Sequence, residues 1–365
     1  MTLEGRFDGE VVRVAGDARQ RFHDARGYGY PLEGNEIALA PVEAAHLLFR
    51  EDLSGVVDEP AGGAVRGFRA FLSREPTPSP DFGIRFLVYA DLRSRGFYLA
   101  PAREPWVADP PHAADLVVFP RGKGPADGEI QYGLRVVGER TDLPATALLE
   151  DGATRSSDDP DGVTNALAVV DEESEITYFE RRRPTFDGTS ASELPSGLEA
   201  DLLEDRVICW DPPVSLYERT FYGQPLEGRE YDEPTLQCSL VEAAHLAEAG
   251  AIDLDPETVH ARGRAVEGDR FDRRFAVYAH LRAAGVVPKT GYKFGADFRT
   301  YDAVTNVDDL AHSERLVRVL PADHVFEPRD LSLDVRLAHG VRKTMVFGLV
   351  DDGVVEWVSL ERLTP

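Results

Sequence analysis

Lysine and cysteine are scarce in this chain. All but four of its 40 basic residues are arginines, and the four lysines are Lys123, Lys289, Lys293 and Lys343. Only two cysteines, Cys209 and Cys238, occur in 365 residues. Two isolated cysteines supply neither the paired ligands of a zinc site nor the spaced set of a disulfide framework. We therefore expect two buried free thiols in a reducing environment.

Long apolar runs are also missing. No stretch is apolar over the roughly 20 residues that a membrane-spanning helix needs. The N-terminus does not show the charged and apolar regions of a secretory signal peptide. We therefore expect a cytoplasmic protein. Its 365 residues, 42% of them hydrophobic, suffice for two or more domains with their own cores.

Basic charge is in the minority. The chain has 65 acidic residues against 40 basic ones, a formal net charge of −25. An acidic surface poor in lysine is typical of a salt-saturated cytoplasm, where a Debye length of about 3 Å or less screens the self-repulsion. This charge argues against non-specific nucleic-acid binding, which needs cations for the phosphates. Residues 291–343 are nearly neutral, with eight basic and nine acidic residues, so an anionic ligand is compatible with them.

The chain contains the same unit twice. Five blocks recur in the same order: 31–34 and 225–228, 42–47 and 241–246, 85–97 and 274–286, 114–119 and 296–301, and 167–181 and 347–362. The third pair, RFLVYADLRSRGF and RFAVYAHLRAAGV, has eight identities in thirteen positions. The retained order indicates a tandem duplication. We place the first repeat at 1–183, a linker rich in Pro, Gly, Ser and Thr at 184–204, and the second repeat at 205–365.

Each repeat is predicted to be mixed α/β. In the second repeat, Phe271, Phe275, Tyr278 and Leu281 recur at helical spacing, and Gly285 supplies the helix stop. Short β-rich runs follow at 298–301 and 316–320, and a second helix is expected at about 331–342.

A hairpin is expected to close each repeat. In the second repeat, the turn Asp351-Asp352-Gly353 joins strands at 345–350 and 354–360. In the first, the equivalent hairpin turns through Asp171, Glu172 and Glu173. We expect the last strand, 354–360, to pack against the equivalent strand of the first repeat, 176–179.

Several frequent catalytic motifs are absent. The sequence has no G-x-x-x-x-G-K-[ST] phosphate loop, no H-E-x-x-H zinc motif and no G-x-S-x-G nucleophile elbow. It also lacks a carboxylate two residues before a lysine, as some metal-dependent nucleases have. Those positions hold Arg121, Val287, Gly291 and Val341.

The two repeats differ in three polar residues. Tyr301 aligns with Phe119, His312 with Glu129 or Ile130, and Lys343 with the neighbourhood of Val163. A requirement of the scaffold would act on both repeats, whereas a requirement of chemistry can act on one.

Each of the three residues also has a structural interpretation. Tyr301 alone is typical of a half-buried strand aromatic, Lys343 of a residue that complements a helix C-terminus, and His312 of a surface histidine. Together, an imidazole that donates a proton, a phenol beside a cation and an ammonium suit metal-free cleavage of a ribose phosphodiester by its 2′-hydroxyl. Their joint loss from the first repeat favours this chemistry.

Three runs carry a resemblance to a known family. They are KTGYKFGADFRTY (289–301), AHSERLVRVL (311–320) and VRLAHGVRKTMVFGLVDD (335–352). They resemble the archaeal tRNA-splicing endonucleases, in the subgroup that fuses a degenerate and a catalytic repeat and then dimerises. The resemblance implies an N-terminal α/β subdomain in each repeat, followed by a nuclease-like subdomain with a mixed sheet. It places the catalytic subdomain at about 271–365.

The resemblance also implies site residues and a reaction. Tyr301 would be the general base, His312 the general acid, and Lys343 the group that stabilises the transition state, with no metal or cofactor. The substrate would be precursor tRNA with a bulge–helix–bulge, cut at both splice sites to leave 2′,3′-cyclic phosphate and 5′-hydroxyl ends. Arg336 and Arg362 would clamp a flipped bulge base, and we interpret His339 as structural.

A homodimer is implied as well. In relatives an acidic hairpin loop of the degenerate repeat docks into a polar groove of the partner's catalytic repeat, here the loop with Asp171, Glu172, Glu173 and Glu175. These carboxylates are equally typical of a solvated halophilic surface. Two other functions remain open: a non-catalytic RNA-binding scaffold subunit, and a metal-dependent nuclease on a related fold.

Overall fold

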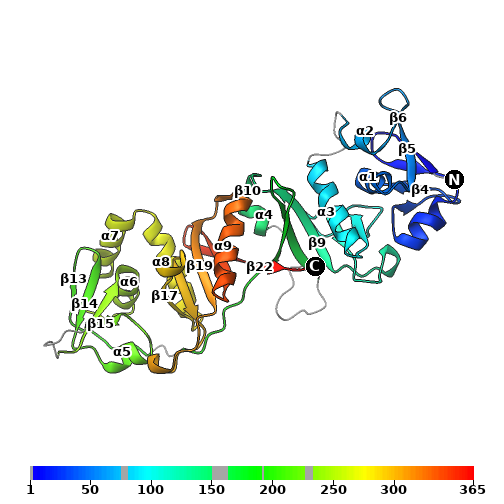
Figure 1. Cartoon of the computed structure of the whole chain (residues 1–365). Coiled ribbons are helices and arrows are strands. Elements are labelled where there is room, and N and C mark those ends of the chain that lie inside the picture. Colours follow the sequence, from blue (N-terminus) through cyan, green and yellow to red (C-terminus); the bar gives the residue numbers. More distant parts are fainter. Residues whose placement is uncertain (1–2, 75–80, 150–162, 191–192, 227–232) are drawn as a thin grey trace.

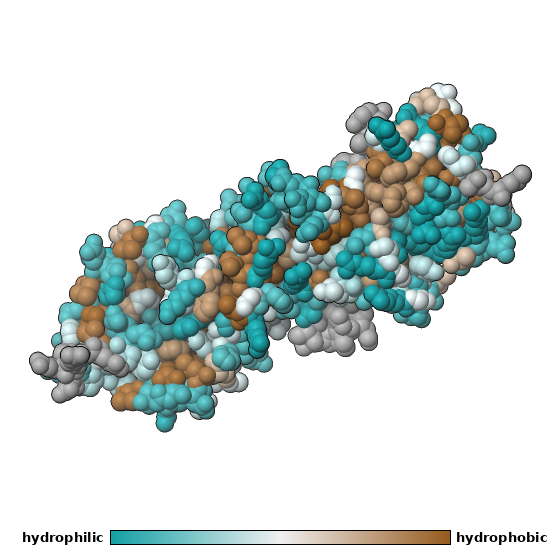
Figure 2. All heavy atoms as spheres, in the orientation of Figure 1, coloured by the Kyte–Doolittle hydropathy of each residue, from teal (hydrophilic) through white to brown (hydrophobic). Residues whose placement is uncertain are grey.

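The molecule is elongated and consists of four subdomains in a row (Figure 1). The computed structural model describes residues 3–74, 81–149, 163–190, 193–226 and 233–365. The N-terminal subdomains of the two repeats lie at opposite ends, and the two nuclease subdomains meet in the middle (Figure 1). This arrangement confirms the mixed α/β class. The face shown in Figure 2 is mostly hydrophilic, with apolar side chains in separate small areas.

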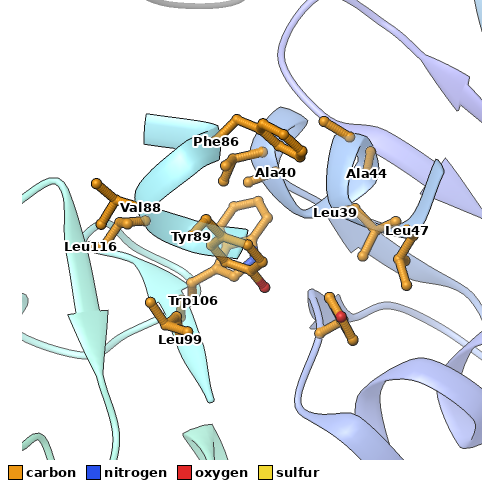
Figure 3. Close-up of a cluster of buried hydrophobic side chains, with 14 of the residues drawn as sticks. Leu39, Ala40, Ala44, Leu47, Phe86, Val88, Tyr89, Leu99, Trp106 and Leu116 are labelled. Carbon is orange, nitrogen blue, oxygen red and sulfur yellow. The ribbon is translucent and has the colours of Figure 1, made fainter. Parts of the chain in front are cut away.

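The N-terminal subdomain of the first repeat is a six-stranded sheet covered by helices. The sheet order is β3-β4-β2-β1-β5-β6. Its strands are β1 (Leu3–Phe7), β2 (Val12–Val14), β3 (Tyr30–Pro31), β4 (Ile37–Leu39), β5 (Leu53–Asp58) and β6 (Ala64–Arg66), and its helices are α1 (Pro41–Phe49) and α2 (Phe68–Leu72). Helix α3 (Phe82–Ser94) joins this subdomain to the nuclease subdomain. Phe86 and Tyr89 of α3 lie toward α1, while Val88 lies toward Leu116 (Figure 3).

The N-terminal subdomain of the second repeat is smaller. Its sheet has the order β13-β14-β16-β15. The strands are β13 (Ala200–Leu202), β14 (Arg206–Trp210), β15 (Gln224–Pro225) and β16 (Thr235–Ser239), and the helices are α5 (Val214–Glu218), α6 (Leu240–Glu248) and α7 (Pro256–Glu267). Because β13 pairs with β14, the last residues of the segment expected as a linker, 184–204, belong to this sheet. Cys209 and Cys238 are buried and free, as expected.

One sheet of ten strands runs through both nuclease subdomains. Its order is β17-β18-β19-β21-β22-β12-β11-β9-β8-β7. The first repeat contributes β7 (Leu99–Pro101), β8 (Leu116–Val118), β9 (Tyr132–Gly138), β11 (Thr164–Val170) and β12 (Ile176–Arg182). The second contributes β17 (Val287–Thr290), β18 (Phe298–Tyr301), β19 (Arg315–Pro321), β21 (Thr344–Asp351) and β22 (Val354–Leu363). The two halves therefore repeat the same strand order about the central β22–β12 pair.

The two repeats contact each other through two strand pairs, and each pair joins equivalent strands of the two repeats. The closing hairpins pair antiparallel through β22 and β12, with Phe179 opposite Arg362 and Arg181 opposite Leu360. The expected contact between 354–360 and 176–179 is therefore found, shifted toward residues 359–363 and 178–182. A short ribbon of β10 (Leu143–Pro144) and β20 (Val325–Phe326) makes the second junction.

Two helices cover opposite faces of the sheet in the second repeat. Successive strand residues alternate between faces, so Val317 enters the core with α8 (Arg270–Ala283) and Leu316 enters the core with α9 (Pro328–Gly340). Helix α8 matches the expected helix, and Gly285 follows it with a φ of 72°. Helix α9 begins at Pro328, earlier than expected. In the first repeat its place after β10 is taken by α4 (Thr146–Leu149). In the described parts of the chain, no helix is long and apolar enough to cross a membrane.

Each N-terminal subdomain buries one glutamate beside its nuclease subdomain. In the first repeat, the carboxylate of Glu43 accepts hydrogen bonds from the backbone N–H of Gly29 (2.7 Å) and Ala40 (2.8 Å) and from Nε1 of Trp106 (3.0 Å). Burial raises the pKa of Glu43 from 4.5 to about 7, because these neutral donors only partly offset the lost hydration.

The equivalent glutamate of the second repeat has a cation. Glu242 accepts from Nζ of Lys289 at 2.6 Å, and also from the backbone N–H of Gly223 and Ser239. Burial alone would raise the pKa of Glu242, but the Lys289 ammonium and the hydrogen bonds from Ser239 together outweigh burial and hold this pKa below its ordinary value. The same fold therefore carries a glutamate with neutral donors in one repeat and an ion pair in the other.

Candidate active site

Three neighbouring strands bring the predicted catalytic residues to one end of the sheet. Tyr301 is the last residue of β18, His312 lies in the loop before β19, and Lys343 directly precedes β21. The backbone N–H of Glu314 donates to the carbonyl of Thr300 (3.1 Å), and that of Thr344 donates to the carbonyl of Glu314 (3.1 Å). The three chain segments therefore lie side by side.

The first repeat has the same backbone hydrogen bonds but lacks the hydroxyl, the imidazole and the ammonium. Gln131 N–H donates to the carbonyl of Val118 (2.8 Å), and Thr164 N–H donates to the carbonyl of Gln131 (3.1 Å). This register equates Tyr301 with Phe119, His312 with Glu129 and Lys343 with Val163, and so decides between Glu129 and Ile130.

Tyr301 is held in an aromatic and aliphatic setting. Its side chain is buried and belongs to a small cluster with Phe221, Val287 and Val304. The rings of Tyr301 and Phe221 lie 5.7 Å apart between centroids, tilted by 60°. On the polar side, the guanidinium carbon of Arg299 lies 5.7 Å from the centroid of the Tyr301 ring.

Lys343 is directed toward the loop that carries His312. Its Nζ donates a hydrogen bond to the carbonyl of Ser313. The preceding residue, Arg342, has a φ of 58°, and this left-handed turn separates α9 from β21. Burial and, second, the positive charge of Arg299 lower the pKa of Lys343 below its ordinary value of 10.5. His312 itself is exposed.

A cavity of about 590 Å³ opens beside Lys343, between the end of α9 and the end of β22. Its walls include His339, Arg342, Lys343 and Arg362. The structure therefore brings Arg362 next to Lys343. Arg336 lies outside the cavity, exposed on α9 one helical turn before His339. We interpreted His339 as structural, but in the structure its side chain is exposed and lines the cavity.

Arg299 is a site residue that the motif comparison did not single out. It lies opposite Lys289 on the paired strand β17, so two cations are cross-strand neighbours. The corresponding pair in the first repeat is Val117 and Ala100, both apolar and buried. Like charges in direct cross-strand positions destabilise a sheet. The alignment of ADLVVF with ADFRTY could have pointed to Arg299, because it places Val117 of the first repeat opposite this arginine.

A second hollow, of about 520 Å³, separates the N-terminal subdomain of the second repeat from strands β17 and β18. We call it the cationic groove, because five basic side chains line it: Arg206, Arg274, Lys289, Lys293 and Arg299. Asp205 and Glu242 are the acidic side chains in its wall.

The acidic loop of the first repeat is the hairpin turn between β11 and β12. Asp171 is engaged within the loop, where its Oδ1 accepts from the backbone N–H of Glu173 (2.9 Å) and Glu175 (2.8 Å). Glu172 pairs with Arg140 at 2.6 Å. The side chains of Glu173 and Glu175 are exposed.

Comparison with known proteins adds the family. The model of the tRNA intron endonuclease catalytic C-terminal domain matches residues 271–357, and that of its N-terminal domain matches 3–66 and 198–261. Over the full length of both chains, the sequence is 54% identical to the tRNA-splicing endonuclease of Halobacterium salinarum and 53% identical to that of Haloferax volcanii. It is 34% identical to that of Methanococcoides burtonii, over 96% of this chain and 97% of the other. The chain belongs to the tRNA intron endonuclease family and is an endonuclease.

Proposed function

We propose that this endonuclease excises introns from precursor tRNA by cutting both splice sites of a bulge–helix–bulge. The observation that carries the proposal is the gathering of Tyr301, His312 and Lys343 at one end of β18, β19 and β21, where the equivalent first-repeat positions hold Phe119, Glu129 and Val163. The relatives named above, all tRNA-splicing endonucleases, support the same substrate.

The reaction is an internal transfer at phosphorus. Tyr301 takes the proton of the 2′-hydroxyl, and the 2′-oxygen forms a bond to the adjacent phosphorus. The bond from phosphorus to the 5′-oxygen breaks, and His312 gives that oxygen its proton. The ammonium of Lys343 stabilises the charge on the non-bridging oxygens in the transition state. The products carry a 2′,3′-cyclic phosphate and a 5′-hydroxyl, and no metal ion takes part.

Substrate binding relies on arginine. Arg336 and Arg362 clamp a flipped bulge base by cation–π contact. The location of Arg362 beside Lys343 supports this role. Phe179 of the first repeat lies opposite Arg362 in the strand pair, so the first repeat helps to hold the backbone of Arg362 in place. Arg336 lies on α9 outside the cavity, so in this proposal the bulge extends from Arg362 along α9.

The active form in this proposal is a cytoplasmic homodimer. Two catalytic repeats related by a two-fold axis match two scissile bonds. The acidic loop of one chain docks into the cationic groove of its partner, since Glu173 and Glu175 are exposed and five basic side chains line the groove. At molar salt such a contact requires partial burial.

The test is cleavage of an end-labelled bulge–helix–bulge RNA in molar KCl with excess EDTA. We expect two symmetric cuts that leave cyclic phosphate, and loss of both cuts in Lys343→Ala and in His312→Ala. Lys123→Ala is the matched control, because Lys123 is a partly exposed lysine of the first repeat that pairs with Glu129. Binding without cleavage by the wild type would support the scaffold function instead. Cleavage that EDTA abolishes would support a metal-dependent nuclease.

A further inference from the structure

Phe221 has a backbone conformation that its side chain disfavours. Its φ is 53°, in the left-handed region, and its ring is buried with 4% exposure. Residues with a Cβ atom, bulky ones above all, are strained in this region. The first repeat has Gly27 at the equivalent position, with a φ of 65°. The fold therefore needs this conformation in both repeats, and only the second repeat combines it with a large side chain.

The first repeat shows that the same space can be filled without strain. A Cβ atom on Gly27 would meet the ring of Tyr98 at 3.1 Å, so an aromatic side chain from the start of β7 covers this glycine. The position of Tyr98 is taken by Val287 in the second repeat. The first repeat thus has Gly27 in the loop and Tyr98 just before β7. The second repeat has Phe221 and Val287 at these two positions. In the second repeat the ring of Phe221 therefore lies against the ring of Tyr301, and Val287 is the cross-strand neighbour of Tyr301.

Lys289 fixes the loop that carries Phe221. Its Nζ donates to the carbonyls of Phe221 (3.3 Å) and Gly223 (3.0 Å), and it lies 4.7 Å from the centroid of the Phe221 ring. The ion pair with Glu242 compensates the buried charge. The first repeat has Ala100 at this position. A buried lysine is therefore present only in the catalytic repeat, in a chain that otherwise almost avoids lysine.

Other supports of this loop are common to both repeats and do not explain the difference. Arg282 donates to the carbonyl of Thr220 at 2.7 Å, just as Arg93 donates to the carbonyl of Arg26 at 3.0 Å. The features peculiar to the second repeat are the ring of Phe221, which lies against the ring of Tyr301, and the ammonium of Lys289, which contacts Phe221.

We propose that Phe221, held in its left-handed conformation by Lys289, is a positioning residue for Tyr301. Its ring limits rotation of the phenol, so that the hydroxyl is aimed at the 2′-hydroxyl of the substrate before the reaction begins. This inference rests on the proposed function. It adds that the rate of the chemical step depends on two residues that do not touch the RNA.

The first test transplants the arrangement of the first repeat. In the double variant Phe221→Gly/Val287→Tyr, we expect the single-turnover rate at saturating RNA to fall about 10- to 100-fold, since a misplacement of about 1 Å costs up to about 100-fold. Affinity for a bulge–helix–bulge RNA with 2′-deoxyribose at the scissile positions should change less than about threefold, because the substrate contacts remain. A rate within about twofold of wild type overturns the proposal.

Two further variants cover the case in which the double variant does not fold. Phe221→Leu keeps the site apolar, and Lys289→Met/Glu242→Gln removes both charges of the pair together. Each should show the same separation of rate from affinity. Phe271→Leu, in a fully buried phenylalanine of α8, is the matched control and should leave the rate unchanged below its melting temperature.

A thermodynamic cycle separates positioning from general packing. If Phe221 acts through the hydroxyl of Tyr301, Phe221→Leu lowers the rate in the wild type but not in a Tyr301→Phe background, where the residual rate is followed over long incubations. Equal losses in both backgrounds overturn the proposal. If the wild type does not cleave the RNA at all, the proposed function fails. If it cleaves and the Phe221 variants cleave equally well, only this inference fails.

Discussion

The two repeats share a fold, but only the second repeat places polar side chains at three positions of its outer two strands. The first repeat fills the positions of Tyr301, Arg299 and Lys289 with Phe119, Val117 and Ala100, which are all buried and apolar. It forms the same strand order with those residues. The fold therefore does not need a hydroxyl or two neighbouring cations at this place. The second repeat accepts the desolvation and repulsion of these groups, and this difference supports the proposal that the chemistry takes place there.

The largest expected effect concerns the hydroxyl that separates Tyr301 from Phe119. Tyr301→Phe should lower the single-turnover rate by about 10²- to 10⁴-fold, because the variant lacks the hydroxyl that acts as the general base in the proposed reaction. The reciprocal change, Phe119→Tyr, should leave the rate unchanged and is the control. The measurement is cleavage of radiolabelled RNA at saturating enzyme. A Tyr301→Phe rate within tenfold of wild type would show that the two repeats do not differ in chemistry at this position.

The second effect concerns the buried glutamates. Glu242→Gln leaves the ammonium of Lys289 buried without its partner, so we expect the free energy of unfolding to fall by about 3–5 kcal/mol. Addition of Lys289→Met should recover most of this loss. Guanidinium denaturation in molar KCl measures both values. If Glu242→Gln costs less than about 1 kcal/mol, the ion pair does not stabilise the second repeat.

The third effect is the opposite pH dependence of the two repeats. The pKa of Glu43 is raised from 4.5 to about 7 in the folded state, so the folded state binds more protons between these values. Its contribution to stability is present below about pH 4.5 and is lost as the pH rises to about 7, by up to about 3 kcal/mol. The lowered pKa of Glu242 has the reverse sign, with stability lost only in acid.

Glu43→Gln tests this sign. We expect the difference in unfolding free energy between wild type and variant to change between pH 4.5 and 7, in favour of the variant as the pH rises. Glu242→Gln should show no such gain in this window. A wild type whose unfolding free energy rises relative to Glu43→Gln over the same range would contradict the assignment.

The smallest expected effect concerns the two hairpin turns. Neutralising Glu172, Glu173 and Glu175 together should weaken the proposed homodimer about tenfold, or about 1.4 kcal/mol, and less at higher salt. Asp171 is kept because it holds the turn. Neutralising Asp351 and Asp352 in the second repeat is the control. Sedimentation over a range of concentrations gives the dissociation constants, and equal effects of both changes would remove the distinction between the hairpins.

The sequence predicted the elements with a local signal. Helix α8 follows from the spacing of Phe271, Phe275 and Tyr278, and the hairpins follow from their acidic turns. The register of three strands places the chain segments that carry Tyr301, His312 and Lys343 side by side, and the catalytic roles of these residues stay predictions. The end of the linker was missed, because three residues of β13 carry no periodic signal and pair only through β14.

Two kinds of site feature were outside the reach of the sequence. The left-handed backbone of Phe221 is invisible in a residue type that rarely adopts it, and only its alignment with Gly27 points to it. The exposure of His339 depends on where α9 ends relative to β22, which is a tertiary property. Residue identity gives chemistry, whereas burial and backbone angle come from packing.

The central β22–β12 pair has a consequence for synthesis of the chain. The strand partner of Phe179 is Arg362, which is synthesised about 180 residues later. At roughly 5–20 residues per second, the edge of β12 that faces away from β11 has no partner for on the order of ten seconds or more on the ribosome. During that time the first repeat presents an unpaired strand edge to neighbouring nascent chains on the same message. Slower translation of the second repeat therefore lengthens the time for which this edge is exposed.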